Sequence, residues 1–446
     1  MSLNRRILHL ALPSILANIT IPLVGLVDTA IVGHISDASA IGGIAIGTML
    51  FDLLYWNFGF LRVGTSGLTA QAFGRKDSAE CARLFVQSIG ISALGALFVW
   101  AIQWLFVMAV LACVPCSPEV AEFAREYFFV RIWAAPATLS LMAFKGWFIG
   151  MQDTVSPMAT DILVNVVNIV ASYYLAVYTP LGAIGVAHGT LLAQYSGLLL
   201  SIIIVATKYR KVFRNTQVWA ILTDFRSMRR LLVLNGNLFV RSLCFMVVYV
   251  GFTALASRYG DTELAVSAIM MKLFMLFSYF IDGFAYAGEA LVGRFIGEKQ
   301  MNLVKNAIRI LFIWAMGIGG VFSVLYAVAG EPCIRLLTND LSVIDGAAPY
   351  MGWLIAMPIV SALAFLWDGI FVGATAGKEI RNGMIFAAIA FVFGYGLTYH
   401  YQWCGVQALY IGYFSHLVAR MVYMTFKWKS IYDREVGKSQ MEGTQN

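Results

Sequence analysis

Charged residues are scarce in this chain. Only 12% of its 446 residues are Asp, Glu, Lys or Arg, whereas 60% are hydrophobic. A soluble domain carries about 25% charged residues, because its surface must stay hydrated. Together with a mean hydropathy of +0.77, this scarcity excludes an ordinary soluble protein and indicates that most of the surface faces lipid.

The sequence also lacks the common motifs of enzymes and nucleotide-driven machines. It contains no GxxxxGK[ST] phosphate loop, no HExxH zinc helix and no GxSxG nucleophile turn. Its six cysteines are scattered; Cys113 and Cys116 have CxxC spacing, but neither a second pair nor a neighbouring histidine. An incidental pair is the preferred interpretation, and a disulfide stays open. We therefore expect no metal, no cofactor and no enzymatic activity.

Long apolar stretches are abundant. A membrane-spanning helix needs about 20 mostly apolar residues, and we find twelve such stretches, at 7–32, 40–73, 83–113, 127–150, 156–178, 181–206, 231–257, 262–296, 304–329, 346–374, 380–400 and 403–427. The first is read as an uncleaved helix rather than a signal peptide, because apolar sequence continues well beyond Pro13. The chain is therefore predicted to be an all-α polytopic membrane protein.

Lysine and arginine residues collect in every other loop between these stretches. The largest group lies in the 207–230 loop, and others flank the first span, follow the second, eighth and tenth spans, and close the chain. The positive-inside rule then places both termini and the 207–230 loop in the cytoplasm of a bacterial inner membrane. Because these cations lie beside spans, we assign them to lipid headgroups rather than to nucleic acid.

The two halves of the chain resemble each other. The segment ending at Gly74 resembles the one ending at Gly297, and Gly150 with its neighbours resembles Gly373 with its own, both at the same offset along the chain. A third match, Gly185 with Gly405, comes at a slightly shorter offset and suggests a small deletion. A parallel repeat of this kind is typical of secondary transporters. It predicts two six-helix lobes at 1–206 and 231–427, a basic linker at 207–230 and a polar cytoplasmic tail at 428–446.

Several segments resemble the multidrug and toxic compound extrusion (MATE) family, and two of them its DNA-damage-inducible F (DinF) branch. The family pattern is carried by residues 13–18, 27–33, 58–71, 150–154 and 165–170, and the branch pattern by 237–242 and 281–293. The resemblance covers about residues 5–427. It implies a cation-coupled antiporter that exports amphipathic, often cationic, organic compounds by alternating access of its two lobes. Because both halves are present in one chain, we expect a monomer.

Asp28 is the leading candidate for the coupling site. A charge at the bilayer centre costs at least about 2.5–3.5 kcal/mol, and a carboxyl group in apolar surroundings can bind and release a proton near neutral pH. Pro13 and Pro22 weaken the same helix and supply a hinge. A permanently hydrogen-bonded structural aspartate is the alternative.

Polar residues of the fifth and sixth spans are expected beside Asp28: Asn165, Asn168, Ser172 and Thr190. In relatives, the resemblance implies an Asn-x-x-x-Asp pattern that brings a second carboxylate to this pocket. Here Ser172 stands at that place, which weakens a Na⁺ site and favours H⁺. A purely structural role, in which the two asparagines form hydrogen bonds between helices, is equally favoured.

The second half carries its own intramembrane charges, Arg241, Lys272, Asp282, Glu289 and Asp368. We expect them to form a charged cluster that pairs internally or attracts a cationic substrate. The resemblance implies a glutamate at Arg241 in the Na⁺-coupled branch, so a cation there argues against Na⁺.

The eighth span contributes an adaptable apolar surface, Met271, Phe274 and Met275, suited to a hydrophobic cavity or simply to lipid contact.

The sequence therefore favours a proton-coupled multidrug exporter. Three alternatives stay open: a Na⁺-coupled exporter, a flippase for lipids or lipid-linked oligosaccharides, and a membrane enzyme acting on lipid. The last two are disfavoured, because neither a strongly cationic central cavity nor a catalytic constellation is evident in the sequence.

Overall fold

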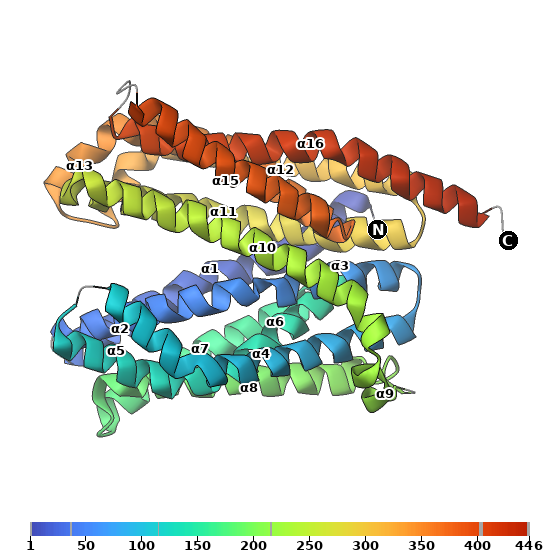
Figure 1. Ribbon diagram of the computed structural model, residues 1–446, viewed down its shortest axis with the longest axis horizontal. Coiled ribbons are helices and arrows are strands. Elements are labelled where there is room, and N and C mark those ends of the chain that lie inside the picture. The colour runs from blue at the N-terminus through green and yellow to red at the C-terminus, as the bar shows by residue number, and fades with distance from the viewer. Residues whose placement is uncertain (1, 36–37, 115, 215, 401–404, 444–446) are drawn as a thin grey trace. The chain divides into compact units, whose positions relative to one another are not determined.

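The computed structural model describes residues 2–35, 38–114, 116–214, 216–400 and 405–443, and over these ranges every regular element is a helix (Figure 1). Ten helical segments are long and apolar enough to cross a membrane. The long helices α1 (Leu3–Ile35) and α16 (Gln407–Gly443) bring the number to twelve. The predicted all-α architecture of twelve spans is confirmed. Cys404 lies outside the described residues, and the five described cysteines are free.

The chain divides into two compact units. One contains residues 16–232 and the other residues 1–15 and 233–446. Both boundaries fall inside continuous helices, one within α1 and one within α10 (Phe225–Ala256). Each of these two helices therefore contributes to both units.

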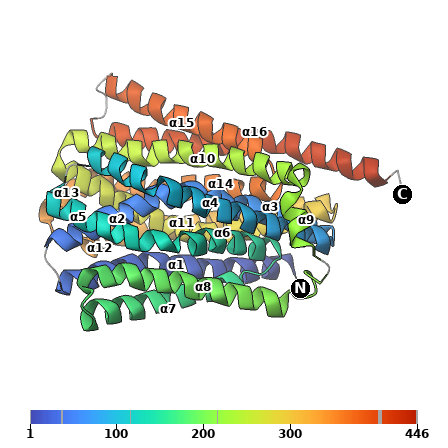
Figure 2. The ribbon, with the colours of Figure 1, turned by 60° about the horizontal axis from the view of Figure 1, so that its bottom comes forward.

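The first unit is built from the second part of α1 and the helices that follow it. These are α2 (Ala38–Tyr55), α3 (Phe60–Gly74), α4 (Ser78–Cys113), α5 (Pro118–Arg131), α6 (Ala135–Gly150), α7 (Val155–Tyr178), α8 (Gly185–Lys208) and the short α9 (Val218–Thr223). Single 3₁₀ turns join α2 to α3 and α5 to α6, so that each pair forms one long span. Helices α7 and α8 run side by side (Figure 2).

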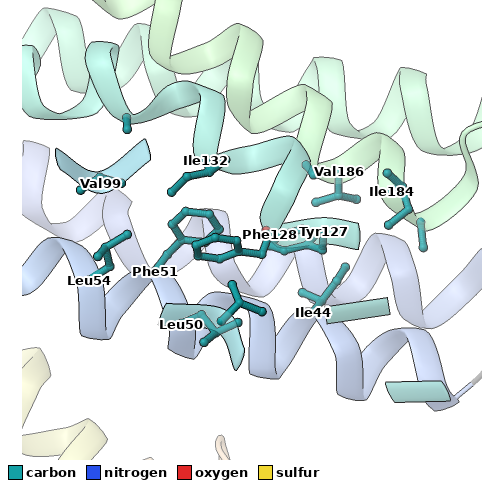
Figure 3. Packing of buried hydrophobic residues seen from close by; sticks show 14 of the residues in the cluster. Ile44, Leu50, Phe51, Leu54, Val99, Tyr127, Phe128, Ile132, Ile184 and Val186 are labelled. Carbon is teal, nitrogen blue, oxygen red and sulfur yellow. The ribbon is translucent and has the colours of Figure 1, made fainter. Parts of the chain in front are cut away.

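An aromatic core holds α2 and α5 of this unit together. The rings of Phe51 and Phe128 stack with their centroids 4.8 Å apart, and Ile44, Leu50 and Tyr127 pack around them (Figure 3). Dispersion between close-packed groups is a principal source of helix association inside lipid, where water supplies no hydrophobic driving force. This core fixes the end of α5, which carries Arg131.

The second unit repeats the plan with α10, α11 (Asp261–Gly297), α12 (Met301–Arg335), the short α13 (Leu341–Ala347), α14 (Met351–Gly373), α15 (Gly377–His400) and α16. Helix α16 continues to Gly443 and so includes most of the segment predicted to be a polar tail.

The internal repeat is visible in the backbone as well as in the sequence. Non-glycine residues with positive φ follow matching helix ends: Lys76 at 59° and Lys299 at 60°, then Gln152 at 63° and Thr375 at 53°. Both pairs have the same spacing along the chain as Gly74 and Gly297.

A pair of glycines extends this backbone match and corrects one prediction. Gly182 and Gly405 share the left-handed conformation, at 52° and 53°, and they too have the spacing of Gly74 and Gly297. The deletion expected from the third sequence match is therefore wrong, because Gly405 corresponds to Gly182 rather than to Gly185.

Matching glycines allow matching helices to touch. A Cβ atom on Gly146 of α6 would collide with the backbone of Arg62 on α3, and one on Gly369 of α14 would collide with the backbone of Ala285 on α11. Small residues at such crossings permit close backbone approach inside a membrane. A tight helix crossing of each unit therefore lies at the same place in the repeat.

We expect Gly146→Ala to lower the thermal stability of the purified protein in detergent, because overpacking a close contact costs typically about 1–3 kcal/mol. Gly369→Ala should have a similar effect. Gly317→Ala is the matched control, since nothing lies within 4 Å of a Cβ atom built there. A melting temperature for Gly146→Ala that equals that of Gly317→Ala would contradict this account of the crossing.

Candidate functional site

Asp28 lies on α1 inside the first unit, and its side chain is buried. The hydroxyl of Ser172 on α7 lies near it and Arg131 is the cation that acts on it, while Asp28 Oδ1 has no hydrogen-bond partner among the described residues. Ser172 is itself completely buried. The structure therefore brings together the predicted carboxylate and one of its predicted polar partners.

The remaining predicted polar residues form short hydrogen bonds around this position. Asn168 Nδ2 donates to Thr190 Oγ1 at 2.9 Å, and that hydroxyl donates to the Val186 carbonyl oxygen at 3.1 Å. Asn168 and Ser172 are four residues apart on α7 and therefore share one face. The amide oxygen of the same asparagine, Asn168 Oδ1, is buried without a hydrogen-bond partner among the described residues.

Asn165 ties α7 to α1. Its Nδ2 donates to Thr20 Oγ1 at 2.5 Å, and Thr20 in turn donates to the Ala17 carbonyl oxygen at 2.7 Å. The two asparagines thus act in different ways: Asn165 bonds to the helix that carries Asp28, whereas Asn168 bonds to α8.

Gly189 lets α7 and α8 approach closely enough for this arrangement. A Cβ atom at Gly189 would collide with the backbone and the hydroxyl of Ser172. The Ser172 hydroxyl also lies 3.4 Å from the Val186 carbonyl oxygen, so it faces a backbone acceptor on α8 as well as Asp28.

Arg131, at the end of α5, is a charged residue that the sequence analysis missed. Its Nη1 donates to the Tyr127 hydroxyl at 3.0 Å, and its guanidinium carbon lies 4.6 Å from the centroid of the Phe51 ring. An arginine inside a predicted span is itself a signal of function or pairing, and the same rule that selected Asp28 could have found it.

The proline hinge predicted in α1 remains a prediction. Helix α1 is continuous from Leu3 to Ile35 and passes through both Pro13 and Pro22. Proline removes a backbone donor and frees the carbonyl one turn earlier, so the helix is weakened at both positions.

A second charged group lies in the other unit, around Asp368 on α14. Arg241 Nη2 of α10 donates to Asp368 Oδ2 at 2.7 Å. Arg420 Nε of α16 donates to Asp368 Oδ1 at 3.0 Å, and Arg420 Nη2 also contacts Oδ2. One carboxylate thus connects three helices.

Arg420 is the more deeply buried of the two arginines, with 1% of its side chain exposed against 26% for Arg241. Arg420 lies within the predicted span 403–427 and was not among the residues predicted for this cluster. Its Nη1 has no hydrogen-bond partner among the described residues, and its guanidinium carbon lies 5.5 Å from the Phe365 ring centroid.

The other charges predicted for this cluster are placed differently. Asp282 acts electrostatically on Arg420 and so belongs to the group, and Glu289 is buried on α11. Lys272 is exposed, and no ion pair in the described ranges joins it to Asp368. Lys145, which the repeat matches to Asp368, instead donates to Asp161 Oδ2 at 2.6 Å.

The predicted apolar wall lies on α11. Met271 and Phe274 are buried and Met275 is half-buried. The Phe274 ring stacks on Tyr413 with centroids 5.7 Å apart, so Phe274 takes part in helix packing in this structure. The role of these residues in a cavity stays a prediction.

No group of three His, Cys, Asp or Glu side chains in the described part of the chain lies close enough to hold an ion.

Comparison with known proteins gives consistent matches over nearly the whole chain. The MatE family model matches residues 13–174 and 238–400. The chain is 34% identical to DNA damage-inducible protein F of Escherichia coli, covering 96% of this chain and 92% of that protein. It is 22% identical to human Multidrug and toxin extrusion protein 1, covering 92% and 71%. Among solved structures, one described as MATE in the bent conformation superposes with a TM-score of 0.88 at 18% identity, over 99% and 98% of the chains.

The structure predicts that replacing Asp368 strongly lowers the thermal stability of the protein. Replacing it by leucine leaves Arg420 buried without the carboxylate that its guanidinium contacts, and breaking a buried pair from one side costs about 3–5 kcal/mol. The double change Asp368→Leu with Arg420→Met should recover much of that loss. A double-mutant cycle of thermal unfolding in detergent measures both.

Glu331→Gln is the matched control, because it breaks the exposed pair with Arg335 and should cost at most about 1 kcal/mol. If Asp368→Leu were no more harmful than this control, the buried cluster would not stabilise the unit.

Proposed function

Because the chain belongs to the MATE family of multi-pass membrane transporters, we propose that it is a proton-coupled exporter of amphipathic, often cationic, organic compounds. Transporters of this family extrude drugs and toxins and are not enzymes. We propose the coupling ion, the substrate preference and the residues that couple the two. This proposal is supported above all by the burial of Asp28 beside Ser172, with its Oδ1 unpartnered among the described residues.

A proton changes the hydrogen bonding at this contact in a defined way. When Asp28 is ionised it only accepts, so the Ser172 hydroxyl donates to it. When Asp28 is protonated its own O–H donates to Ser172, and the serine hydroxyl is then free to donate to the Val186 carbonyl oxygen 3.4 Å away. Loading a proton on α1 would thereby switch a hydrogen bond between α7 and α8.

The composition of the two polar sites supports H⁺ rather than Na⁺. A hard cation prefers several oxygen ligands, carboxylates among them. Ser172 supplies a hydroxyl where related transporters would bring a second carboxylate to Asp28. In the other unit Arg241 and Arg420 occupy the surroundings of Asp368, and two guanidinium groups repel a bound Na⁺.

Bending of α1 is the proposed link from proton to substrate. Pro13 and Pro22 weaken the helix on the N-terminal side of Asp28, and Asn165 bonds to Thr20 between Pro13 and Pro22. A structural neighbour is described in a bent conformation, which fits a helix that can change shape. Protonation of Asp28 would bias this equilibrium, since a ligand shifts a population only by binding one state better.

We assign different roles to the charges of the second unit. Asp368 is engaged by two arginines, so the group fixes α10, α14 and α16 together. Asp282 and the partly buried Met275 are left as the candidates for contact with a cationic, lipophilic substrate. The proposed location is the bacterial inner membrane, as a monomer with both termini in the cytoplasm.

A second candidate function is a flippase for lipids or lipid-linked oligosaccharides. It is favoured by one observation, the two guanidinium groups of Arg241 and Arg420 beside Asp368, because guanidinium groups suit a phosphate-bearing lipid.

The test is export of a fluorescent lipophilic cation by proteoliposomes. With an imposed pH gradient and no Na⁺, the wild type should transport, and Asp28→Asn should fall to the leak of protein-free liposomes, because an amide cannot exchange protons. Glu119→Gln, at an exposed carboxylate on α5, should transport as the wild type does.

Transport driven by a Na⁺ gradient at constant pH would overturn the proton assignment. Transport that survives in Asp28→Asn would remove Asp28 from the mechanism. If neither gradient drives transport in any variant, the flippase becomes the better hypothesis, and movement of a labelled lipid between leaflets becomes the measurement.

A further inference from the structure

A cavity of about 750 Å³ lies at the end of α8 in the first unit, and its lining includes neither Asp28 nor Asp368. Its lining joins two kinds of surface. Three cations, Arg210, Lys211 and Arg214, come from the turn that follows α8. Apolar side chains of α4, α6 and α8, among them Phe85, Phe144 and Ile202, supply the rest together with Phe213 of the same turn.

The three cations are exposed and available to a ligand. No carboxylate of the described residues pairs with Arg210, Lys211 or Arg214, and all three side chains are exposed. The neighbouring Lys208 is different, because its Nζ donates to Asp153 Oδ2 at 2.7 Å. The cavity therefore presents a concentrated positive charge that the unit itself does not neutralise.

A buried network holds the basic turn in place. The Tyr209 hydroxyl donates to Asp153 Oδ2 at 2.8 Å, and the Ser156 hydroxyl donates to the same oxygen at 2.5 Å. Burial alone would raise the pKa of Asp153, but hydrogen bonds from Lys208, Ser156 and Tyr209 hold that pKa below its usual value. The carboxylate stays ionised, and the turn it anchors is fixed before any ligand arrives.

Aromatic rings stiffen the apolar part of the cavity lining. Phe85 packs edge-on against Phe144 with centroids 4.9 Å apart, and against Phe213 at 5.3 Å. Trp147 lies behind them and donates through its Nε1 to the Cys81 carbonyl oxygen at 2.9 Å. This packing ties the turn to α4 and α6.

The cavity opens onto the exposed apolar face of α8. Ile202 lines it and is 48% exposed, and the apolar face of α8 continues through Ile203 at 49% and Leu199 at 60%. Exposed apolar residues along a membrane-spanning helix face acyl chains. Cations at the end of such a face lie at the depth of the headgroups.

We propose that this cavity binds an anionic phospholipid. Its phosphate lies among Arg210, Lys211 and Arg214, and the part of an acyl chain nearest the headgroup lies along Phe85, Phe144 and Ile202. Charge complementarity selects a headgroup of net negative charge. Continuity with the exposed face of α8 selects a lipid over a soluble anion. The bound lipid would fasten the turn after α8 to the helices of the first unit.

The experiment uses full-length protein in nanodiscs of phosphatidylglycerol and phosphatidylethanolamine, compared with nanodiscs of phosphatidylcholine alone. Native mass spectrometry then counts the phosphatidylglycerol retained after release into detergent. Each basic residue near an anionic headgroup contributes about fivefold to binding. Changing Arg210, Lys211 and Arg214 together to Gln should therefore weaken retention on the order of 100-fold.

Two further variants separate the site from general surface charge. Ala206→Trp fills the cavity without changing its charge and should also lose the lipid. Changing Arg226, Arg229 and Lys429 together to Gln removes three exposed cations outside the cavity and should retain it. Equal loss in this control and in the cavity triple variant would overturn the proposal.

A competition arm distinguishes the lipid from a free anion. Inorganic phosphate and glycerol 3-phosphate at millimolar concentration should leave retention of phosphatidylglycerol unchanged. Displacement by either would show a site for soluble phosphates and contradict the proposal, as would undiminished retention in Ala206→Trp.

Discussion

A carboxylate or guanidinium group inside a bundle of apolar helices must be paired, hydrogen-bonded or neutralised by a proton, because hydrocarbon offers it no water. The two units meet this requirement in opposite ways. In one, Asp368 is held by Arg241 and Arg420, an arrangement that fixes helices. In the other, Asp28 lies beside the neutral hydroxyl of Ser172 under the influence of Arg131, and this is the arrangement that we propose responds to a proton.

The repeat supplies one scaffold twice, and the difference between the units lies in a few side chains. With the halves aligned as the left-handed residues match, Asn168 corresponds to Phe391 and Thr190 to Tyr413, so the polar contact between α7 and α8 is replaced by aromatic residues on α15 and α16. Lys145 corresponds to Asp368 and pairs with Asp161 instead. The glycine contacts shared by the two units preserve the helix crossings. The side chains that differ at Asn168, Thr190 and Lys145 give each unit its own electrostatics.

The helices and the repeat could be predicted from the sequence because apolar length and self-similarity are local properties. Asp28 could be found for a similar reason, since an isolated charge stands out in an apolar span. Arg131 and Arg420 obey the same rule and were overlooked. Pairing could not be predicted: that Arg420 rather than Lys272 contacts Asp368 depends on how three helices pack. The offset of the last match was wrong because Gly182, Gly185 and Gly405 look alike until their φ angles are known.

The most direct test of the account is whether the first unit changes shape when Asp28 takes up a proton. Spin labels at exposed Ala30 on α1 and Leu192 on α8, in a cysteine-free background, report the distance between these helices by electron paramagnetic resonance. The account predicts one distance distribution at mildly acidic pH and another at mildly alkaline pH, with Asp28→Asn showing the acidic distribution throughout. A wild-type distribution that does not depend on pH, or an Asp28→Asn variant that still responds to pH, would contradict it.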